Sequence, residues 1–375
     1  MLRAEGPCLR IDMVTPRFHP SIGGIEESVL QLSLGLTRRG HSVTVHTMRM
    51  QDWPEKERFQ GLDVRRYPAV MDRGYYVSRF EPDLSGEITH LHAYAHQTND
   101  WVIAKRRGVT PIFLSTHHGA RFPKPRLYAK LYHAFYNRFR GIPNLRSLKG
   151  VLVPTGLDAQ DFSERGVPPE IIHVVPSGAD ERLYGNVAPW TPNGIARGFI
   201  LYVGRLHEEK GVLDLLVAQG LLPNKPPMVV AGRDGGLLAE LDVSALRKQN
   251  VHVLTEFTAE QRFGLIAACG LFVLPSHHEG QGIVVAEAWA QRKPVVATRA
   301  GALPSVIDDG TDGILVPVKD PEKLATAMQR VLGNGDLAKR LAAEGRAKAE
   351  AQFRWPDIVS RVEQLYLSSR NTRRA

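Results

Sequence analysis

The sequence predicts an α/β protein with two doubly wound domains, and three observations point to this fold class. The chain has 375 residues, too many for one ordinary core and enough for two domains of typical size. Short apolar runs alternate with helical patterns, an order typical of parallel sheets with helices on both faces. The alternation lapses in a segment rich in Pro, Gly and Asn at 185–197 and then starts again. We therefore expect an N-terminal domain at 1–186, a linker at 187–197, a C-terminal domain at 198–355 and a terminal helix at 356–375.

The first domain is predicted to begin with a buried strand at 9–16 and an amphipathic helix at 25–40, which Gly40 ends. The apolar residues near one face of this helix are Val29, Leu30, Leu34 and Leu36. Further apolar runs predict strands at 41–48, 88–93, 111–116, 150–155 and 171–178.

The second domain repeats this pattern. A capping box at 258–261 begins one helix, and Asp320 followed by Pro321 begins another. In doubly wound sheets, ligands bind beyond the carboxyl ends of the strands. With two such domains we expect the site in the cleft between them. The apolar runs that predict strands lie at 198–204, 227–232, 251–256, 271–276, 294–298 and 313–317.

Composition and charge narrow the class of protein. The chain is 43% hydrophobic and 23% charged, as in soluble globular proteins, and its net charge of +9 favours an anionic partner such as a nucleotide, a phospholipid surface or nucleic acid. The two cysteines, Cys8 and Cys269, argue against a disulfide framework and fit a reducing compartment. No apolar run approaches the roughly 20 residues that cross a bilayer, and the N-terminus lacks a signal-peptide pattern. We expect a cytoplasmic protein, or one peripheral on the inner face of the membrane.

Two motifs at strand ends could bind a diphosphate. Gly23 and Gly24 follow the first strand and precede a helix, so the backbone could approach a ligand where the helix N-terminus favours negative charge. A tight turn without a ligand explains this pair equally well. In "GRLHEEKG", Arg205 and Lys210 come just after a strand, where they suit phosphate oxygens. The alternative is a pair of solvated charges, but the position after the strand favours the diphosphate.

Two glutamates, Glu279 and Glu287, lie on either side of a glycine-flanked turn. If both were on one helix, eight residues would separate them by about 12 Å of rise, whereas retaining glycosidases hold their two carboxyls about 5 Å apart. The spacing therefore suits two contacts on one elongated ligand. Carboxylates are good acceptors for hydrogen bonds from the sugar and ribose hydroxyls of such a ligand. Backbone N–H groups near Gly280 and Gly282 would lie between them. Alternatively, Glu287 is an exposed helix charge.

The histidines give a weaker signal. His117 and His118 follow a strand in "STHHG", where a lone histidine is more often structural, and a second adjacent pair lies at 277–278. No group of His, Cys, Asp or Glu has clear metal-ligand spacing, so we predict no bound metal.

A basic aromatic segment lies at 121–149. It contains eight Lys or Arg, no Asp or Glu, and six aromatics, with apolar residues at helical spacing. Such a helix can lie on an anionic membrane surface. A stripe of aromatics facing the core, with a solvated basic face, explains the pattern at least as well, and no recognised nucleic-acid module is present.

Together these motifs resemble the retaining glycosyltransferases of family 4. The resemblance covers nearly the whole chain, from "GGIEESVLQLSLGLTRRGHSVTVHT" and "VVPSGAD" to "GRLHEEKG", "EGQGIVVAE" and "PVVATRAGALPSVIDDGTDGILV". It implies the GT-B architecture, in which two Rossmann-like domains face each other across a cleft, the first binding the acceptor and the second the nucleotide-sugar. The terminal helix is then expected to cross back to the N-terminal domain.

The resemblance also implies roles for single residues. Arg205 and Lys210 would hold the donor diphosphate, Glu279 the sugar hydroxyls and Glu287 the ribose. The remaining donor contacts would come from Gly23, Gly24, Phe257, Gly280, Gly282 and Ile283, and His118, rather than His117, would lie beside the donor sugar. The implied reaction is a front-face substitution, without a metal or other cofactor, from a UDP- or GDP-sugar to a hydroxyl of a lipid, glycan or small molecule. The catalytic set would be His118, Glu279, Arg205 and Lys210.

Departures from the family pattern and competing functions remain. Arg292 stands where glycine is usual, Gln281 where phenylalanine is common, and Ser305 where an acid is frequent; they leave the donor and loop shape open. An epimerase acting on nucleotide-sugars would share the architecture. An NAD-dependent oxidoreductase should show Gly-x-Gly-x-x-Gly at its first strand, which "IGGIEE" lacks. The set Arg205, Lys210, Glu279 and Glu287 argues against a non-catalytic sugar- or membrane-binding protein.

Overall fold

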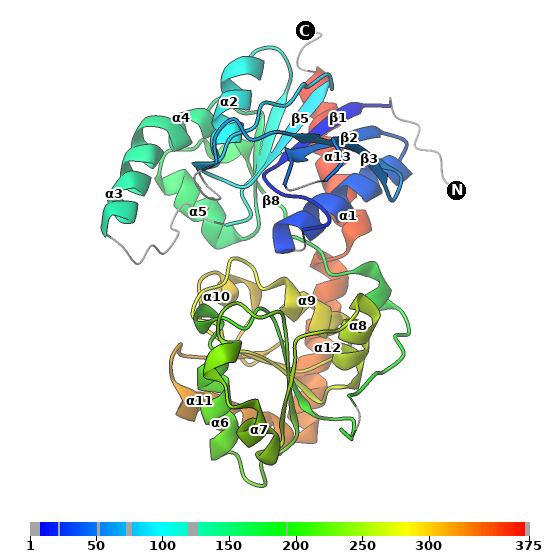
Figure 1. Ribbon diagram of the computed structural model, residues 1–375, viewed down its shortest axis with the longest axis vertical. Helices are drawn as coiled ribbons and strands as arrows, with labels where there is room; N and C mark the ends of the chain where they lie inside the picture. The colour runs from blue at the N-terminus through cyan, green and yellow to red at the C-terminus, as the bar shows by residue number, and fades with distance from the viewer. Residues whose placement is uncertain are drawn as a thin grey trace. The chain divides into compact units, whose positions relative to one another are not determined.

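The chain forms two compact units (Figure 1). The computed structural model describes residues 8–21, 23–50, 53–72, 77–118, 127–192 and 194–371. One unit comprises Met1–Ser177 and Trp355–Ala375, and the other comprises Gly178–Arg354. The division falls ahead of the predicted linker at 187–197, because that segment packs on the second unit. There, Trp190 donates its backbone N–H to Gly264 at 3.0 Å and lies against the core.

The first unit contains an eight-stranded sheet in the order β3-β4-β2-β1-β5-β6-β7-β8. All neighbouring strands are parallel except the antiparallel β3 and β4 at the edge. The predicted strands are confirmed. The β3–β4 hairpin was missed, because its charged, half-exposed sequence lacks an apolar run. The strands are β1 (Arg10–Thr15), β2 (Ser42–Met48), β3 (Lys56–Phe59), β4 (Leu62–Tyr67), β5 (Ile88–His92), β6 (Ile112–Ser115), β7 (Gly150–Val153) and β8 (Ile172–Val174).

Helices cover this sheet, and two of them come from opposite ends of the chain. Helix α1 buries the four apolar residues predicted for its core face, and it packs beside α13, as Figure 1 shows. Gly35 permits this close packing, because a Cβ there would lie 2.4 Å from Val359 of α13. The helices are α1 (Gly24–Arg38), α2 (Gln97–Arg106), α3 (Leu127–Tyr136), α4 (Ile142–Leu145), α5 (Gly156–Glu164) and α13 (Trp355–Asn371), with a π-helix at Asn137–Gly141.

The second unit contains a six-stranded parallel sheet in the order β11-β10-β9-β12-β13-β14. All six predicted strands are present: β9 (Ile200–Val203), β10 (Met228–Ala231), β11 (Val251–Leu254), β12 (Leu271–Leu274), β13 (Val295–Thr298) and β14 (Ile314–Val316). The predicted capping box at Thr258 and the N-cap at Asp320 are confirmed. The helices are α6 (Val212–Leu221), α7 (Val243–Lys248), α8 (Ala259–Ala268), α9 (Ile283–Ala290), α10 (Leu303–Val306), α11 (Pro321–Leu332) and α12 (Gly335–Gln352). Among the described residues, no helix is both long and apolar enough to span a bilayer.

A buried carboxylate attaches α13 to the rest of the first unit. Glu363 is 6% exposed, and it accepts hydrogen bonds from Arg39 at 2.7 Å and from His41 at 2.7 Å. Burial alone would raise the pKa of Glu363, but the hydrogen bonds from Arg39 and His41 outweigh it and leave the pKa below its usual value. The segment at 355–371 therefore belongs to the first unit through charge as well as apolar packing.

Replacing Glu363 with Gln should destabilise the first unit by about 2 kcal/mol at neutral pH, the loss expected for hydrogen bonds to a charged group. Because the folded-state pKa is lowered, the wild-type advantage is complete above the ordinary glutamate value of 4.5 and disappears as pH falls through the folded-state pKa. Urea unfolding at several pH values measures the difference. Asp357→Asn, an exposed carboxylate on the same helix, is the control and should change little. A difference that stays constant down to low pH would contradict the assignment.

Candidate active site

The second sheet changes direction between β9 and β12. The chain runs outward from β9 through β10 to β11, and then returns to place β12 on the other side of β9. Ligands of open α/β sheets bind at such a switch point, beyond the carboxyl ends of the two strands. The loop after β9 carries Arg205 and Lys210, and the loop after β12 carries Glu279. The topology thus brings together residues that are far apart in the sequence.

Close backbone contacts fix these two loops to each other. Gly211 ends the first loop in a left-handed conformation, with φ of 65°, and a Cβ there would lie 2.0 Å from the carbonyl oxygen of Pro275. His277 donates its backbone N–H to the Glu209 carbonyl at 2.9 Å, and its ring Nε2 lies 2.7 Å from Asp214 on α6. Neither loop can shift without the other.

Lys210 and Glu279 form an ion pair at the meeting point of the loops. The Lys210 Nζ lies 2.6 Å from the Glu279 Oε1, and the side chains are 21% and 12% exposed. The Ser276 hydroxyl donates to the same oxygen at 2.8 Å. Within the described chain, the other carboxylate oxygen, Oε2, accepts no hydrogen bond. Glu279 is therefore held in place with one oxygen available.

Arg205 completes the cationic side of this group. Its side chain is exposed, and among the described residues it makes no hydrogen bond or ion pair. Its backbone is fixed, since the hydroxyl of Tyr202 donates to the Arg205 carbonyl at 2.8 Å. Burial raises the pKa of Tyr202, which keeps this hydroxyl a donor. An anion at this edge would meet an exposed guanidinium on a loop whose backbone is held by Tyr202.

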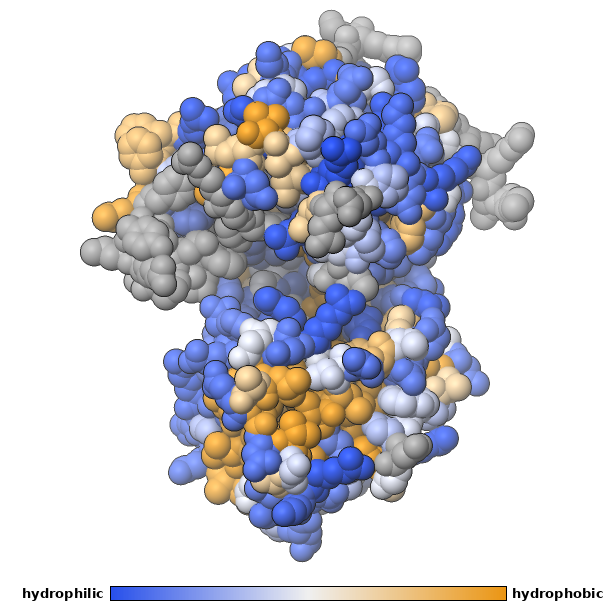
Figure 2. Space-filling model, in the orientation of Figure 1, coloured by the Kyte–Doolittle hydropathy of each residue, from blue (hydrophilic) through white to orange (hydrophobic). Residues whose placement is uncertain are grey.

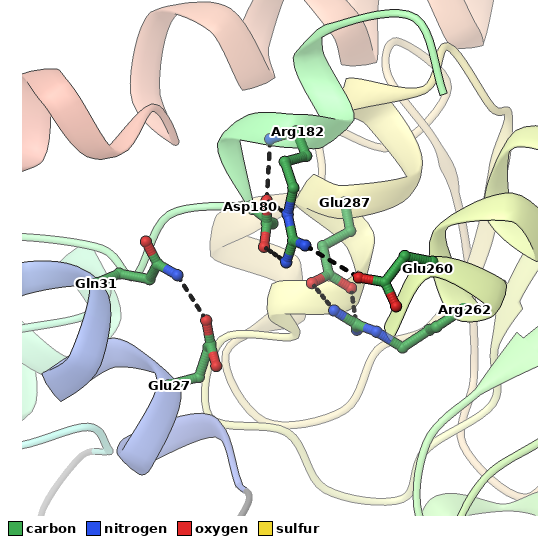
Figure 3. Close-up of polar contacts among 7 residues, drawn as sticks. All are labelled: Glu27, Gln31, Asp180, Arg182, Glu260, Arg262 and Glu287. Carbon is green, nitrogen blue, oxygen red and sulfur yellow. Dashed lines mark hydrogen bonds and ion pairs between the residues drawn. The ribbon is translucent and has the colours of Figure 1, made fainter. Parts of the chain in front are cut away.

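Glu287 is held by a different cation (Figure 3). It lies in α9, 6% exposed, and its two oxygens accept hydrogen bonds from the two terminal nitrogens of Arg262 at 2.7 and 2.8 Å. The alternative of an exposed helix charge is therefore wrong. Each carboxylate oxygen can accept two hydrogen bonds, so binding Arg262 does not by itself use all of the acceptor capacity of Glu287. The two glutamates face separate cations and do not form a carboxyl pair.

A cluster of charges and one aromatic ring supports Arg262. The guanidinium carbons of Arg262 and Arg182 lie 4.9 and 4.7 Å from the centre of the Phe263 ring. Figure 3 shows Arg182 bonded to Asp180 and reaching Glu260. Burial would raise the pKa of Asp180, but hydrogen bonds from the Arg182 side chain and backbone lower it overall.

The other predicted donor contacts in this unit lie after β12, except for Phe257, which follows β11. Gly282 is left-handed, with φ of 74°, and α9 begins at Ile283 without a side-chain cap. Gly280 lies between Glu279 and this helix end, and Phe257 follows β11 partly buried. The first turn of α9 therefore directs backbone N–H groups toward the loop that carries Glu279.

The predicted site residues of the first unit lie after β1 and β6. Gly23 is the extended N-cap of α1, without a side-chain hydrogen bond, and Gly24 is exposed in its first turn. His117 is left-handed, with φ of 61°, and its Nε2 lies 3.0 Å from the Nδ1 of His92. Burial lowers the pKa of His117 to about 3, so this ring is neutral. His118, like His117, is partly exposed.

No group of three or more His, Cys, Asp or Glu residues suited to a metal ion occurs in the part of the chain that the structure describes.

Comparisons with known proteins show which family the chain belongs to. The model for "Glycosyltransferase Family 4" matches residues 22–183, and the model for "Glycosyl transferases group 1" matches 197–334. This chain belongs to the group 1 glycosyltransferases of the family 4 kind. The D-inositol 3-phosphate glycosyltransferase of Xylanimonas cellulosilytica is 28% identical over 94% of this chain and 93% of its own. An MMP alpha-(1->4)-mannosyltransferase from Mycolicibacterium hassiacum is 30% identical, over 59% of this chain and 54% of its own.

Solved structures show the same fold. The sucrose-phosphate synthase of Thermosynechococcus elongatus superposes with a TM-score of 0.76 at 20% identity, covering 95% of this chain and 98% of that one. Anabaena HepE in complex with UDP superposes with a TM-score of 0.72 at 20% identity, covering 96% and 100%. The two parallel-sheet units of this glycosyltransferase are thus the Rossmann-like domains of the GT-B fold.

Sequence reasoning missed three residues that shape the site of this glycosyltransferase. Ser276 and Arg262 bind the two glutamates, but a lone serine and a helix arginine carry no motif. Gly301 is left-handed, with φ of 53°, and a Cβ there would lie 2.1 Å from the carbonyl oxygen of Glu279. A glycine in "ATRAGALPS" after a predicted strand was the available signal.

Gly301→Ala should lower transferase activity at least tenfold, because the added methyl group would displace the Glu279 backbone. A 1 Å misplacement at a site can cost about 100-fold. Gly310→Ala is the matched control, since Gly310 is also left-handed but has open space around its Cβ position. Both variants carry the same backbone strain, so a difference between them in steady-state rate isolates the contact with Glu279. Equal activities would show that the close approach is unimportant.

Proposed function

We propose that this glycosyltransferase transfers a sugar from a nucleoside diphosphate donor, UDP- or GDP-linked, to a hydroxyl acceptor with retention of anomeric configuration and without a metal ion. The observation that carries the proposal is the Lys210–Glu279 pair beside Arg205 at the switch point of the second sheet. Two cations and one carboxylate at that edge match a donor with an anionic diphosphate and a hydroxyl-rich sugar. Solved relatives of this fold that bind UDP or UDP-glucose support the donor class.

The two cations would stabilise the leaving group of the proposed reaction. As the bond between sugar and diphosphate breaks, negative charge grows on the leaving phosphate. Arg205 and Lys210 would stabilise that charge, which is the role of a positioned electrostatic group. Arg205 can form two parallel hydrogen bonds to phosphate oxygens, and Lys210 supplies a point charge.

The two carboxylates would bind the hydroxyl groups of the donor. Glu279 has an oxygen available for the sugar hydroxyls, and the carboxylate of Glu287 would accept hydrogen bonds from the ribose hydroxyls. Each carboxylate lies against a cation, and the proposal gives neither of them the role of attacking nucleophile. A front-face substitution needs no such nucleophile, since the departing phosphate can take the acceptor's proton. The residues of the first unit, Gly23, Gly24 and His118, stay predicted contributors to this site.

Lys210→Ala should reduce kcat/KM by about 100- to 1000-fold, the usual loss when one positioned charge-stabilising group is removed. It should also weaken binding of free UDP or GDP, measured by thermal shift with each nucleotide. Glu279→Ala should impair transfer more than it weakens binding of the free nucleoside diphosphate. Lys339→Ala, an exposed lysine on α12, is the control. Near-normal turnover of the Lys210 variant would overturn the diphosphate assignment.

The product should keep the anomeric configuration of the donor, because attack and departure occur on one face of the sugar. The donor is first chosen by a thermal-shift screen of UDP-, GDP- and ADP-sugars, since a bound ligand stabilises the fold. Proton NMR of the first product then reports the configuration before it can equilibrate. An inverted product would contradict the front-face mechanism but leave the donor site intact.

A further inference from the structure

The helical segment at 127–149 is attached to the first unit by hydrogen bonds as well as by apolar packing. The Tyr136 hydroxyl and the Asn144 amide donate to the Asp100 carboxylate of α2 at 3.0 and 2.7 Å. The Tyr94 hydroxyl donates to Asn137 at 2.7 Å, in the interior. Burial raises the pKa of Asp100. Polar and apolar side chains of this segment both face inward, and Tyr136, Ile142, Leu145 and Leu148 lie in the hydrophobic core of the first unit.

Large apolar side chains lie on the opposite side of this segment. Leu131, Phe135 and Phe139, which we term the outer row, are 63%, 64% and 60% exposed. They recur every four positions, and the Phe135 and Phe139 rings pack against each other with centres 4.5 Å apart. Figure 2 shows apolar side chains at this edge of the first unit. The alternative in which the aromatic stripe faces the core holds for Tyr136 but is wrong for the outer row.

Cations flank the outer row on both sides. A cavity of about 500 Å³ on one side is lined by Arg79 and Arg140 but also by Asp100, and Arg79 is paired with Glu81. A second cavity, of about 560 Å³, is lined by Arg138, Arg146 and Arg165, of which Arg165 is paired with Asp161. The segment at 127–149 contains no Asp or Glu. Exposed apolar side chains with arginines beside them are complementary to a partner that has an apolar interior and anionic groups at its surface.

We propose that the outer row inserts into the surface of an anionic phospholipid bilayer, with the flanking arginines on the headgroup phosphates. Phenylalanine and leucine on one helix face enter the boundary between headgroups and acyl chains, and basic neighbours are attracted by anionic lipid. Apolar exposure alone would not select a lipid. On α6, Leu213, Val217 and Leu221 are also exposed every four positions, 40%, 55% and 54%, but α6 contains Asp214 and no Lys or Arg.

The test is sedimentation of the full chain with vesicles of phosphatidylcholine that contain about one third phosphatidylglycerol, an anionic lipid. The protein should pellet with these vesicles and be released as salt rises, because the headgroup charges are screened. Pure phosphatidylcholine vesicles should retain little of it. Binding that ignores salt, or that is equal for both vesicles, would overturn the proposal.

Two double variants separate the apolar and the cationic parts. F135S/F139S should weaken vesicle binding at least tenfold, and the matched α6 control V217S/L221S should not change it. R138Q/R140Q should weaken binding about fivefold for each arginine removed, and R247Q/K248Q, exposed cations on α7, serves as the control. All these side chains are exposed, so unfolding curves should stay the same. Equal losses in the variants and their controls would refute a localised docking surface.

A second copy of this chain is the competing occupant of the outer row. Sedimentation velocity without lipid distinguishes the two: a dimer that F135S/F139S abolishes would overturn the proposal, and a monomer at all concentrations supports the bilayer. None of these measurements depends on transfer activity, so the lipid proposal and the proposed reaction can fail independently.

Discussion

The side-by-side position of β9 and β12 is the constraint on which the second unit's site depends. Because the sheet reverses there, the loops after these strands begin from neighbouring points, and residues 69 positions apart can form the Lys210–Glu279 pair. The two loops can approach each other this closely only where a glycine leaves the backbone without a side chain. Gly211 lies under the Pro275 carbonyl, and Gly301 lies under that of Glu279. The position of Glu279 therefore depends mainly on these glycine contacts and, after them, on its ion pair with Lys210.

The two glutamates hold their cations in different ways, and this difference suits different tasks. Arg262 binds Glu287 with a planar fork and is itself fixed over Phe263, so that pair is rigid. Lys210 offers a flexible point charge to one oxygen of Glu279. An arriving diphosphate can draw Lys210 toward itself, which frees the Glu279 oxygen for a sugar hydroxyl. On the proposed donor, recognition of phosphate and of sugar would be coupled through this one exchange.

Sequence patterns predicted the strands and the glutamate motif because both rest on local regularities. Continuous apolar runs mark strands buried on both faces, and the motif residues follow those runs directly. The β3–β4 hairpin escaped because its half-exposed edge has no apolar run. Arg262 and Ser276 escaped because their importance comes from tertiary contacts with single glutamates. The outer row was ambiguous from periodicity alone, since the same spacing describes a face that points inward or outward, and the exposure of its three side chains in the structure decides between them.

The departures from the family pattern separate into two kinds once the structure is considered. Arg292 follows α9 with φ of 53°, in the left-handed region that glycine adopts without strain. Its backbone N–H donates to the Trp289 carbonyl at 2.8 Å, at the end of the helix. Its side chain is exposed, so arginine there costs about 1 kcal/mol of backbone strain without reaching the donor loops. Gln281, by contrast, is 6% exposed between Glu279 and α9. A buried amide in that loop needs hydrogen-bond partners that phenylalanine would not, so of these two positions Gln281 is the one that can alter the proposed sugar site.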